Sequence, residues 1–520
     1  MGDVSDWISP YRKEWDEVEK RRLRRLSEGE VSELRAEGVP IVDLRMILET
    51  KRDGRRKGRL ILLGFREPRE WDVGANDSPV ASLASVRSML FMSGSKDDVI
   101  SSIDVSTAFL QSDPFPKDHP KRYVRYREYV GGPVHVYELT GAIYGQRSAS
   151  MAWFKTLRKW LESEGFKPGK DEPCAYVHPV SNLKVLTVVD DMIVRGSKES
   201  TDEFYAKIAG KFNMKDPDYL TPNNPLHFIG YDINMKESSE GYLYSISQEQ
   251  VVGSFLSEID FKPIYNIATP MVSATDIYKD NGELSEVDKS EYRSVVGSLN
   301  YLAQATRYDI QYAVSKLSQH MSNPTKGAQK AAYRVLSYLA ATADFKIEQS
   351  YVPTVNSVQY YTDSNCGGDL PYSTRSQTGI LIMLNHVPVY WRSKKQPVTA
   401  LCSGTSEIYA MSEGLKSARF YKNQVKDIGI ELPVLVPLQT DSKTAISFQR
   451  GTCLNSRLRG HFSLKEGWVI ELRNSNECRV IYTPSQDQLA DIFTKPLVPR
   501  AFKLMLNKIR HGGRVATLGG

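Results

Sequence analysis

The sequence predicts a multidomain α+β and α/β protein, because strand-rich segments lie on both sides of a long helical stretch. Two β-branched runs flank an acid pair in Lys184-Val-Leu-Thr-Val-Val-Asp-Asp-Met-Ile-Val-Arg195, which predicts a β-hairpin with the acids at its tip. Between Tyr292 and Leu339, apolar residues recur at helical spacing instead. A second alternation of strands and helices begins near Ser357. A chain of 520 residues that is 41% hydrophobic and 25% charged can hold roughly two to four such domains.

The elements expected in order before this helical stretch alternate between helices and strands. They are a helix around Trp15–Glu28, a hairpin between Val42 and Phe65 with its turn at Arg52-Asp-Gly54, a helix at Ala81–Met92, a strand at Val99–Val105 that carries Asp104, a helix at Ser148–Gly165, and the acidic hairpin.

The elements expected after Ser357 form a second α/β unit. They are strands at Val358–Thr362, Gly379–Trp391, Val434–Leu438 and Cys478–Tyr482, a helix from about Thr405, and a helix from Ser485, where Ser485-Gln-Asp-Gln488 fits a capping box.

Charge and cysteine usage narrow the class of protein. The net charge is only +6, but dense basic runs such as Lys20-Arg-Arg-Leu-Arg-Arg25 and Arg55-Arg-Lys-Gly-Arg59 could neutralise phosphates. The first run could instead form helical ion pairs with Asp16 and Glu17. Five cysteines without a CxxC pair argue against a zinc site or a disulfide framework and favour a reducing compartment. No apolar run approaches the ~20 residues of a membrane span, so we expect a soluble intracellular protein without a membrane partner.

Three carboxylates on neighbouring predicted strands form a first candidate site. Asp104 ends an apolar strand, and Asp190 and Asp191 lie in the turn of the central hairpin. An isolated Asp-Asp pair is most often simple turn chemistry. Three carboxylates together, however, can hold two divalent ions, which clamp the attacking and leaving oxygens of a phosphoryl transfer.

The residues around these acids resemble the reverse transcriptases of copia-type LTR retrotransposons. The resemblance covers the basic N-terminal region and continues to Leu497, and its motifs occur in the order of that family. These motifs are Lys51-Arg-Asp-Gly54, Lys57-Gly-Arg59, Asp104–Leu110, Tyr137-Glu-Leu-Thr-Gly-Ala-Ile-Tyr-Gly145, Val189-Asp-Asp191, the primer-grip-like Phe228-Ile-Gly-Tyr231 and Ile246-Ser-Gln-Glu249.

The resemblance implies a right-hand polymerase with fingers, palm and thumb, followed by a helical connection and a ribonuclease H-like α/β domain. It also implies RNA-directed DNA polymerase activity, with RNA template, DNA primer and dNTPs as partners and two Mg²⁺ or Mn²⁺ ions in each active site. The implied roles are metal ligation for Asp104, Asp190 and Asp191, triphosphate binding for Lys57 and Arg59, a steric gate for Phe109, nucleotide approach for Gly145, and primer contact for Phe228 and Gly230.

Four further acids carry the second half of the resemblance. Asp363 ends a predicted strand, Glu407 opens a helix, Asp441 follows a strand and Asp491 lies inside a helix. Singly, each such acid is usually a helix cap or a partner of the helix dipole. As an ordered set, together with Trp391-Arg-Ser-Lys-Lys-Gln396, they resemble the ribonuclease H that cuts the RNA strand of an RNA–DNA hybrid. Their implied role is again to hold two metal ions.

Some positions depart from the family pattern. Val188 replaces an aromatic, Arg147-Ser-Ala-Ser-Met151 replaces a Lys-Gln-Ala-Pro-Arg run, and Tyr308 replaces a proline. Near His461 the usual acid is Ser463, and no histidine occurs between His461 and Asp491. A decayed copy that binds nucleic acid without polymerising therefore stays open as an alternative, as does a chain that retains only the ribonuclease.

The expected division places a charged extension at 1–45, fingers and palm at 46–250, a helical thumb and connection at 251–350, a ribonuclease H-like domain at 351–500 and a flexible tail at 501–520. The resemblance makes the chain part of a retrotransposon polyprotein that could associate with other Pol and Gag parts. It implies a cytoplasmic location, in virus-like particles, with a later nuclear stage.

Overall fold

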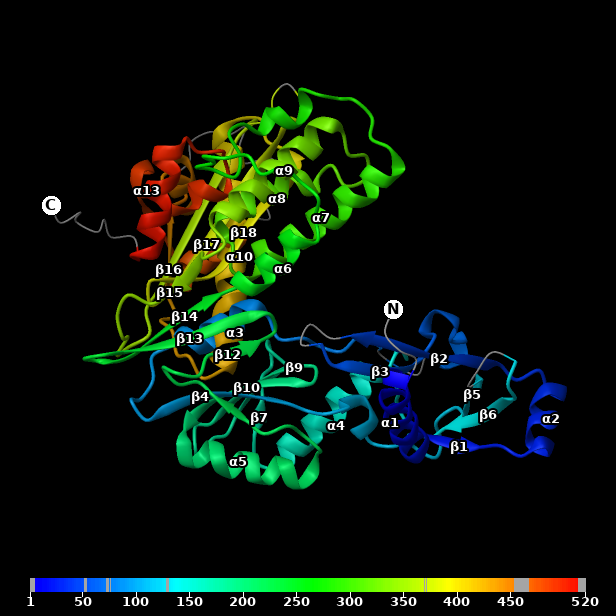
Figure 1. Ribbon diagram of the computed structural model, residues 1–520. Coiled ribbons are helices and arrows are strands. Elements are labelled where there is room, and N and C mark those ends of the chain that lie inside the picture. Colours follow the sequence, from blue (N-terminus) through cyan, green and yellow to red (C-terminus); the bar gives the residue numbers. More distant parts are fainter. Residues whose placement is uncertain are drawn as a thin grey trace.

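The computed structural model describes residues 5–50, 54–71, 74, 76–127, 131–368, 370, 372–452 and 467–512. Within these residues the chain is organised around four β-sheets (Figure 1). We call them the N-terminal, central, four-stranded and C-terminal sheets, in the order in which the chain forms them. A mixed α/β multidomain fold is thereby confirmed.

The N-terminal sheet has the strand order β1-β6-β5-β2-β3. Its strands are β1 (Leu23–Arg25), β2 (Ile41–Thr50), β3 (Arg56–Leu62), β5 (Arg122–Arg127) and β6 (Val134–Leu139). Helix α1 (Ser5–Arg22) packs against β3, and its side chains Trp15 and Val18 are buried. A capping box of Ser27 and Glu30 starts α2 (Glu28–Ala36).

Two expectations for this region need correction. The first helix ends at Arg22 and does not reach Glu28, because the chain turns into β1 and pairs with β6. Position 45/46 falls inside β2, so it cannot separate a charged extension from the rest. The hairpin between Val42 and Phe65 is confirmed as β2 and β3, although residues 51–53 of its expected turn lie outside the described residues.

The central sheet has the order β11-β4-β10-β9-β8-β7. Its strands are β4 (Asp98–Asp104), β7 (Lys167–Pro168), β8 (Ala175–Val177), β9 (Lys184–Val188), β10 (Asp191–Ser197) and β11 (Asp218–Tyr219). Alternation along β10 sets the two faces: Met192 and Val194 pack on one side and Ile193 on the other. Helices α4 (Ala149–Ser163) and α5 (Lys198–Lys211) cover the first face, and α3 (Leu83–Phe91) covers the second (Figure 1).

The four-stranded sheet joins segments that are distant in the sequence. It has the order β12-β13-β14-β15, with β12 (Leu226–Phe228), β13 (Tyr231–Ser238), β14 (Gly241–Ser247) and β15 (Lys346–Glu348). Between β14 and β15 lie the helices α6 (Glu249–Ser257), α7 (Glu286–Ala305), α8 (Gln311–Ser318) and α9 (Lys326–Ala341), with 3₁₀ turns at Ala274–Tyr278 and Tyr308–Ile310. The expected helical stretch is confirmed, but position 250/251 falls inside α6 and is not a boundary.

The C-terminal sheet has the order β18-β17-β16-β19-β20. Its strands are β16 (Val358–Asn365), β17 (Arg375–Leu384), β18 (Val387–Thr399), β19 (Val436–Thr440) and β20 (Cys478–Tyr482), of which β16, β19 and β20 run parallel. Helices α10 (Ser403–Asp427), α11 (Lys443–Gln449) and α13 (Pro499–Arg510) accompany them, and residues 467–474 are also helical.

Two expected elements of this unit are wrong in detail. The strand expected at Gly379–Trp391 is a hairpin, because Asn385 and His386 both adopt positive φ and reverse the chain. The helix expected from Ser485 is a pair of 3₁₀ turns, Ser485–Asp487 and Leu489–Phe493. The capping box does not form, because the Ser485 hydroxyl donates to Asp441 Oδ2 at 2.7 Å.

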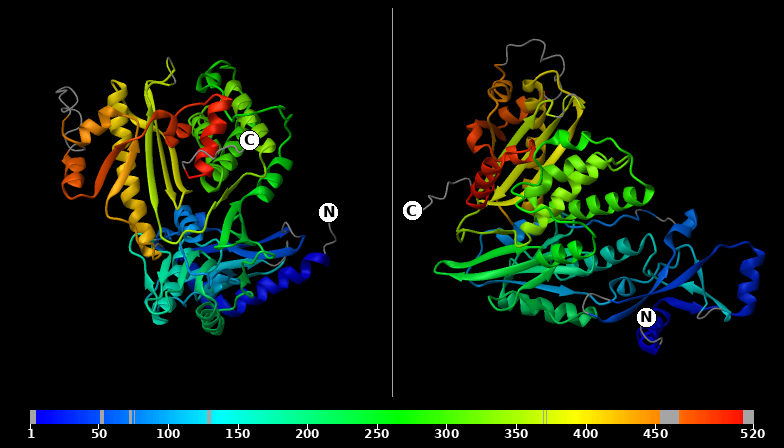
Figure 2. Two further views of the ribbon diagram at one scale, coloured as in Figure 1. Left: turned by 90° about the vertical axis from the view of Figure 1, so that its left-hand side faces the viewer. Right: turned by 45° about the horizontal axis from the view of Figure 1, so that its top comes forward.

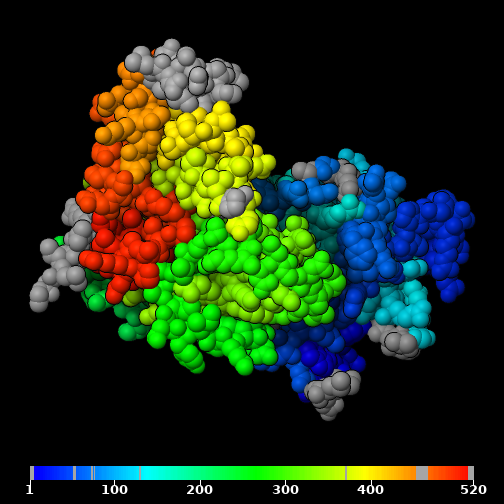
Figure 3. All heavy atoms as spheres, turned by 90° about the horizontal axis from the view of Figure 1, so that it is seen from above, coloured from blue at the N-terminus to red at the C-terminus, as the bar shows by residue number. Residues whose placement is uncertain are grey.

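One continuous core joins much of the molecule, while the N-terminal sheet and the α4–α5 face of the central sheet have separate cores. A single cluster of buried apolar residues runs from α3 through the four-stranded sheet and α7–α9 into the C-terminal sheet. The N-terminal sheet extends away at one end (Figure 2), and from above the helices α6–α9 lie between the N-terminal and C-terminal parts (Figure 3). In the described part of the chain, no helix is long and apolar enough to cross a membrane.

Candidate active sites

The first candidate site lies where β4 ends and β9 turns into β10. Asp191 is the direct cross-strand neighbour of Asp104, and directly opposed residues bring their Cβ atoms to about 5 Å. Asp190 lies in the turn beside Val189, which has a φ of 60°. The Val105 N–H donates to the Asp190 carbonyl at 3.0 Å. The predicted hairpin with its acids at the tip is therefore confirmed, and it meets Asp104 as expected.

The turn is also held from below by α4. The indole Nε1 of Trp153 donates to the Val189 carbonyl at 2.7 Å, and the Trp153 side chain is buried. A positive φ is unfavourable for a β-branched residue such as valine. This hydrogen bond stabilises the strained turn, so helix packing determines where the Asp190 carboxylate lies.

Electrostatics at this site favour a cation. Burial, followed by the charge of Asp104, raises the pKa of Asp190. Burial, followed by the charges of Asp190 and Asp104, raises the pKa of Asp191 to about 6. The ammonium of Lys215 forms an ion pair with Asp104. The oxygens of these three carboxylates are not all within 4.8 Å of one another. In the described chain, the acids of the second candidate site are packed that closely.

Basic and aromatic side chains surround the acid pair. Lys57 and Arg59, alternate residues of β3, both lower the pKa of Asp190 by their charge, so both act on the acid pair; their contact with a triphosphate stays a prediction. Phe109 is half-buried, and its ring centroid lies 5.1 Å from that of Tyr144. Burial raises the pKa of Tyr144, and the charges of neighbouring acids, Asp190 among them, add to this effect. The aromatic pair therefore lines the same site.

The remaining residues expected at this site behave differently. Gly145 has a φ of 80°, and a Cβ there would lie 2.2 Å from the Leu62 carbonyl oxygen. The close approach of two backbone segments already requires this glycine. Gly230 closes the two-residue turn of the β12–β13 hairpin, and a Cβ there would collide with the Tyr301 hydroxyl. Phe228 is only 2% exposed and belongs to the core, so a substrate contact through its side chain is incompatible with this structure.

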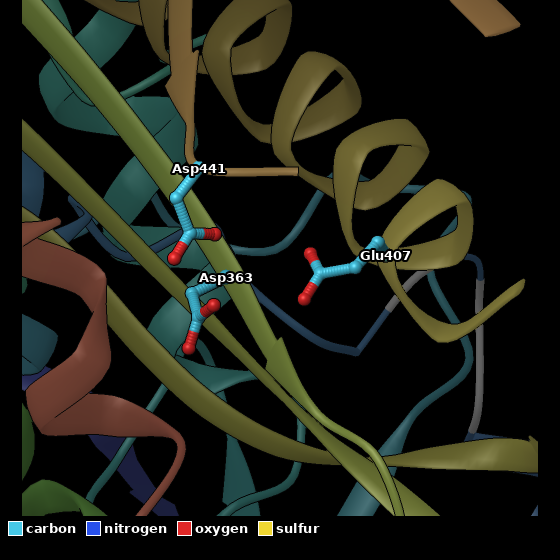
Figure 4. A group of neighbouring side chains, drawn as sticks. All are labelled: Asp363, Glu407 and Asp441. Carbon is cyan, nitrogen blue, oxygen red and sulfur yellow. The ribbon is translucent and has the colours of Figure 1, made fainter. Parts of the chain in front are cut away.

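The second candidate site gathers three acids from three elements. Asp363 lies near the end of β16, Glu407 is in the second turn of α10, and Asp441 directly follows β19. Carboxylate oxygens of the three residues lie within 4.8 Å of one another. In Figure 4, Asp363 and Asp441 project from neighbouring strands, and Glu407 points toward them from the helix. Because β16 and β19 are parallel, their ends meet at one edge of the sheet.

Asp491 completes this site from the turn Leu489–Phe493. It is 7% exposed and forms an ion pair with Lys495 at 2.9 Å. The Thr494 hydroxyl of the same segment donates to Asp363 Oδ2. The structure therefore brings all four expected acids to one place, although only Asp363, Glu407 and Asp441 have carboxylate oxygens within 4.8 Å of one another.

The acids of the second site are strongly perturbed. Burial, followed by the charge of Asp491, raises the pKa of Asp363 well above its usual value. Burial, followed by the charge of Asp441, raises the pKa of Glu407 to about 8. Glu407 Oε2 and Asp491 Oδ1 are buried and have no hydrogen-bond partner. Buried oxygens without partners and mutually repelling carboxylates fit a divalent cation, which would satisfy both.

Strand β18 holds the elements that carry two of these acids. The Ser393 hydroxyl donates at 2.6 Å to the carbonyl of Phe493, two residues after Asp491. The Gln396 amide donates to the Ser406 carbonyl at 3.0 Å, immediately before Glu407. Both side chains are buried. The motif Trp391-Arg-Ser-Lys-Lys-Gln396 thus has a structural role in positioning the acids.

Sequence reasoning missed three polar partners of the acids: Lys215, Thr494 and Lys495. Thr494 and Lys495 follow Asp491 by three and four residues, a spacing that places side chains on the same side of a helical turn, so the sequence could have identified them. Lys215 gives no such signal, because it reaches Asp104 only through folding. His461 and Ser463 lie outside the described residues.

Comparison with known proteins agrees with this geometry. Residues 37–273 match the family described as "Reverse transcriptase (RNA-dependent DNA polymerase)". The chain is 30% identical over 486 residues to the "Retrovirus-related Pol polyprotein from transposon RE2" of Arabidopsis thaliana, covering 91% of this chain and 32% of that protein. It is 27% identical over 511 residues to the corresponding polyprotein "from transposon TNT 1-94" of Nicotiana tabacum, covering 93% of this chain and 37% of that protein.

Two further similarities are more distant. The "Transposon Ty1-DR6 Gag-Pol polyprotein" of Saccharomyces cerevisiae is 24% identical over 489 residues, covering 91% of this chain and 27% of that protein. A solved structure, the "Crystal structure of LC11-RNase H1 in complex with RNA/DNA hybrid", aligns with 26% of this chain and 94% of that chain, at 12% identity and a TM-score of 0.22. The chain spans about a third of the length of the two plant relatives.

The similarity to the transposon polyproteins extends over nearly the whole chain, while the family match covers β2 to β14 and with them the central sheet and the first candidate site. Residues 37–273 of the chain thus match a reverse transcriptase family model, and nearly the whole chain is similar to retrovirus-related Pol polyproteins of transposons.

Proposed function

We propose that this chain is an RNA-directed DNA polymerase with a fused ribonuclease H that degrades the RNA strand of RNA–DNA hybrids. One observation carries the polymerase half: Asp191 faces Asp104 across the ladder, with Asp190 in the adjoining turn and the basic strand β3 opposite. One observation carries the nuclease half: Asp363, Glu407 and Asp441 converge at the edge of the C-terminal sheet.

We assign the parts of the chain to this function as follows. The N-terminal sheet with α1 and α2 serves as fingers, and the central sheet with α3–α5 serves as palm. Helices α6–α9 serve as thumb and connection, and residues from about 351 to 500 form a ribonuclease H-like unit. The N-terminal helix belongs to the fingers in this assignment, because α1 packs on β3 and β1 pairs with β6.

In the polymerase site, Asp104, Asp190 and Asp191 would hold two Mg²⁺ or Mn²⁺ ions. Such ions position the reacting oxygens and stabilise the charge that develops during transfer. Lys57 and Arg59 bind the triphosphate of the incoming dNTP, and the rings of Phe109 and Tyr144 form the floor under its sugar. Lys215 neutralises Asp104 before substrate arrives, so it limits repulsion among the acids in the free protein.

In the nuclease site, Asp363, Glu407, Asp441 and Asp491 would hold the second pair of ions. The raised pKa of Glu407, about 8, means that a cation must compete with a proton for this carboxylate at neutral pH. Lys495, paired with Asp491, places a positive charge where the phosphodiester of the RNA strand approaches.

The test separates the two sites. Asp190→Asn should abolish primer extension on an RNA template and leave cleavage of a preformed RNA–DNA hybrid intact, because only the first site loses a ligand. Asp363→Asn should do the reverse. If either substitution removes both activities in a folded protein, the two-site assignment is wrong.

A second candidate function is a nuclease without polymerase activity, as in a decayed copy. The observation that favours it is the contrast between the sites: the second gathers three of its four acids within 4.8 Å, while in the first Asp104 pairs with Lys215. Primer extension by the parent chain, measured at several Mg²⁺ and Mn²⁺ concentrations, decides between the two. Extension that disappears in Asp190→Asn supports the polymerase; hybrid cleavage without any extension supports the alternative.

A further inference from the structure

A buried arginine joins three parts of the molecule. Arg87, in the middle of α3, is 3% exposed. Its Nε donates to the Val389 carbonyl at 2.8 Å, and its Nη1 donates to the carbonyls of Gln304 at 2.9 Å and Ala305 at 2.6 Å. Burial lowers its pKa, and among the described residues no carboxylate forms an ion pair with it. Backbone dipoles therefore take the place of a counter-ion.

The acceptors lie at a place that suits a cation. Helix α7 ends at Ala305, so its last carbonyls have no partner within the helix and carry the negative end of the helix dipole. Arg87 satisfies two of them. The indole Nε1 of Trp391 in β18 satisfies a third by donating to the Ala303 carbonyl at 2.8 Å. The Trp391 ring lies 4.0 Å from Arg87 Cζ, in a cation–π contact.

Further polar contacts hold α3 on the same surface. The Ser88 hydroxyl lies 2.9 Å from the Tyr421 hydroxyl of α10. The Phe91 carbonyl, at the end of α3, accepts from the Asn385 amide at 2.9 Å and the Gln349 amide at 3.2 Å. These partners come from α10, the β17–β18 turn and the segment after β15. In Figure 1, α3 lies between the central sheet and the C-terminal sheet.

The chemistry of this junction favours a single arrangement. A guanidinium has a rigid, planar set of donors, so it can satisfy Val389 and the end of α7 together only when both lie at fixed positions. If one segment moved away, a buried charge would lose its compensation, which is far costlier than losing a surface ion pair. The junction thus resists sliding or opening in a way that an apolar contact of the same size would not.

We propose that Arg87 is a positioning residue that fixes the ribonuclease H-like unit on the palm and so sets the length of hybrid between the two active sites. This inference rests on the proposed function. The link continues to both sites: α3 packs under the central sheet that carries Asp104 and Asp191, and β18 holds the Asp491 segment through Ser393. The RNA strand is therefore cut at a defined distance behind the growing primer end.

The first arm of the test measures geometry and needs no activity. Spin labels on Lys207→Cys in α5 and Lys443→Cys in α11 report the palm-to-nuclease distance in the full chain, with Cys366, Cys402 and Cys453 replaced by Ser. Arg87→Lys keeps the charge but cannot reach all three carbonyls, and it should broaden the distance distribution.

Two further variants keep this arm decisive. Trp391→Phe keeps an aromatic ring beside Arg87 but loses the indole N–H donor and part of the ring volume, and it should broaden the distribution as well even if Arg87→Lys fails to fold. The exposed arginine Arg500, changed to Lys, is the matched control and should leave the distribution as in the parent. A distribution in a folded Arg87→Lys or Trp391→Phe that is as narrow as that of the parent overturns the inference.

The second arm maps RNA cleavage relative to the primer terminus during synthesis on an end-labelled RNA template, with cysteines unchanged. The parent should cut at one dominant distance, and Arg87→Lys should lose that dominance while extension and cleavage of a preformed hybrid persist. An unchanged cleavage pattern contradicts the inference. A parent that neither extends nor cleaves contradicts the proposed function instead, and the spin-label arm then decides the role of Arg87 independently.

Discussion

Replacing Glu407 by Gln should stabilise the metal-free protein while it abolishes hybrid cleavage. Glu407 is half-buried, its Oε2 has no hydrogen-bond partner, and burial together with Asp441 raises its pKa from 4.5 to about 8. The folded state therefore binds a proton that the unfolded state has released at any pH between these two values. Stability falls as the pH rises through this window, and the loss is complete above the folded pKa.

The magnitude follows from the interval between the two pKa values. At about 1.4 kcal/mol per pH unit, the interval from 4.5 to about 8 gives an upper limit of about 5 kcal/mol. Partial exposure and relaxation of the coupled acids reduce this, so we expect a gain of about 2–3 kcal/mol for Glu407→Gln at pH 8.5. At pH 4.5 the gain should vanish, because the parent carboxyl is then protonated in the folded state.

The assay is thermal or urea unfolding of both proteins in EDTA at pH 5, 6.5 and 8.5, followed by the same series with Mg²⁺. Added Mg²⁺ should stabilise the parent most at high pH and the Gln variant much less, because the ion binds the folded carboxylates. Glu413→Gln, at a half-buried position on the same helix and outside the three converging acids, is the control and should leave the stabilisation by Mg²⁺ as in the parent. A stability difference between parent and Glu407→Gln that stays constant from pH 5 to 8.5 would refute the reasoning.

Three further predictions follow from the two sites. Phe109→Val should admit ribonucleotides while deoxynucleotide use persists, because it removes the ring that packs on Tyr144 and forms the proposed floor under the sugar. Single-nucleotide incorporation checks this, and equal loss of both substrates would show that Phe109 is only a core residue. Lys57→Ala with Arg59→Ala should raise the apparent KM for dNTP with little effect on template binding, and the reverse pattern in kinetic and salt-titration data would assign them to the template. Ser393→Ala should slow hybrid cleavage and spare extension, since it removes the donor to the Phe493 carbonyl, two residues after Asp491, at a cost of about 1–3 kcal/mol. Unchanged cleavage by a folded variant contradicts this role.

Period-two and helical patterns allowed much of the fold to be predicted. The central hairpin was predictable because β-branched residues flank two acids that tolerate a turn, and the structure confirms β9 and β10 around Asp190. The helices between Tyr292 and Leu339 were predictable because their apolar stripes recur at helical spacing, and residues such as Val295, Leu299 and Leu302 are buried as expected.

Other features could not be predicted, because long-range contacts override the local signal. The run Gly379–Trp391 looks like one strand, and only the positive φ angles of Asn385 and His386 divide it. Ser485 looks like a helix cap, but its hydroxyl is engaged by Asp441, which is distant in the sequence. Phe228 looked like a substrate contact, and tertiary packing places it in the core instead.

The sequence by itself determined which residues could do chemistry. Carboxylates at strand ends and in a turn are identified by local pattern, so Asp104, Asp190 and Asp191, as well as Asp363 and Asp441, were found without a structure. Only the tertiary structure decided which of them meet, because a pair separated by tens of residues is joined by sheet pairing and helix packing. It alone revealed Lys215 against Asp104 and Arg87 between three segments, since a buried cation is stabilised by partners that only the folded chain brings together.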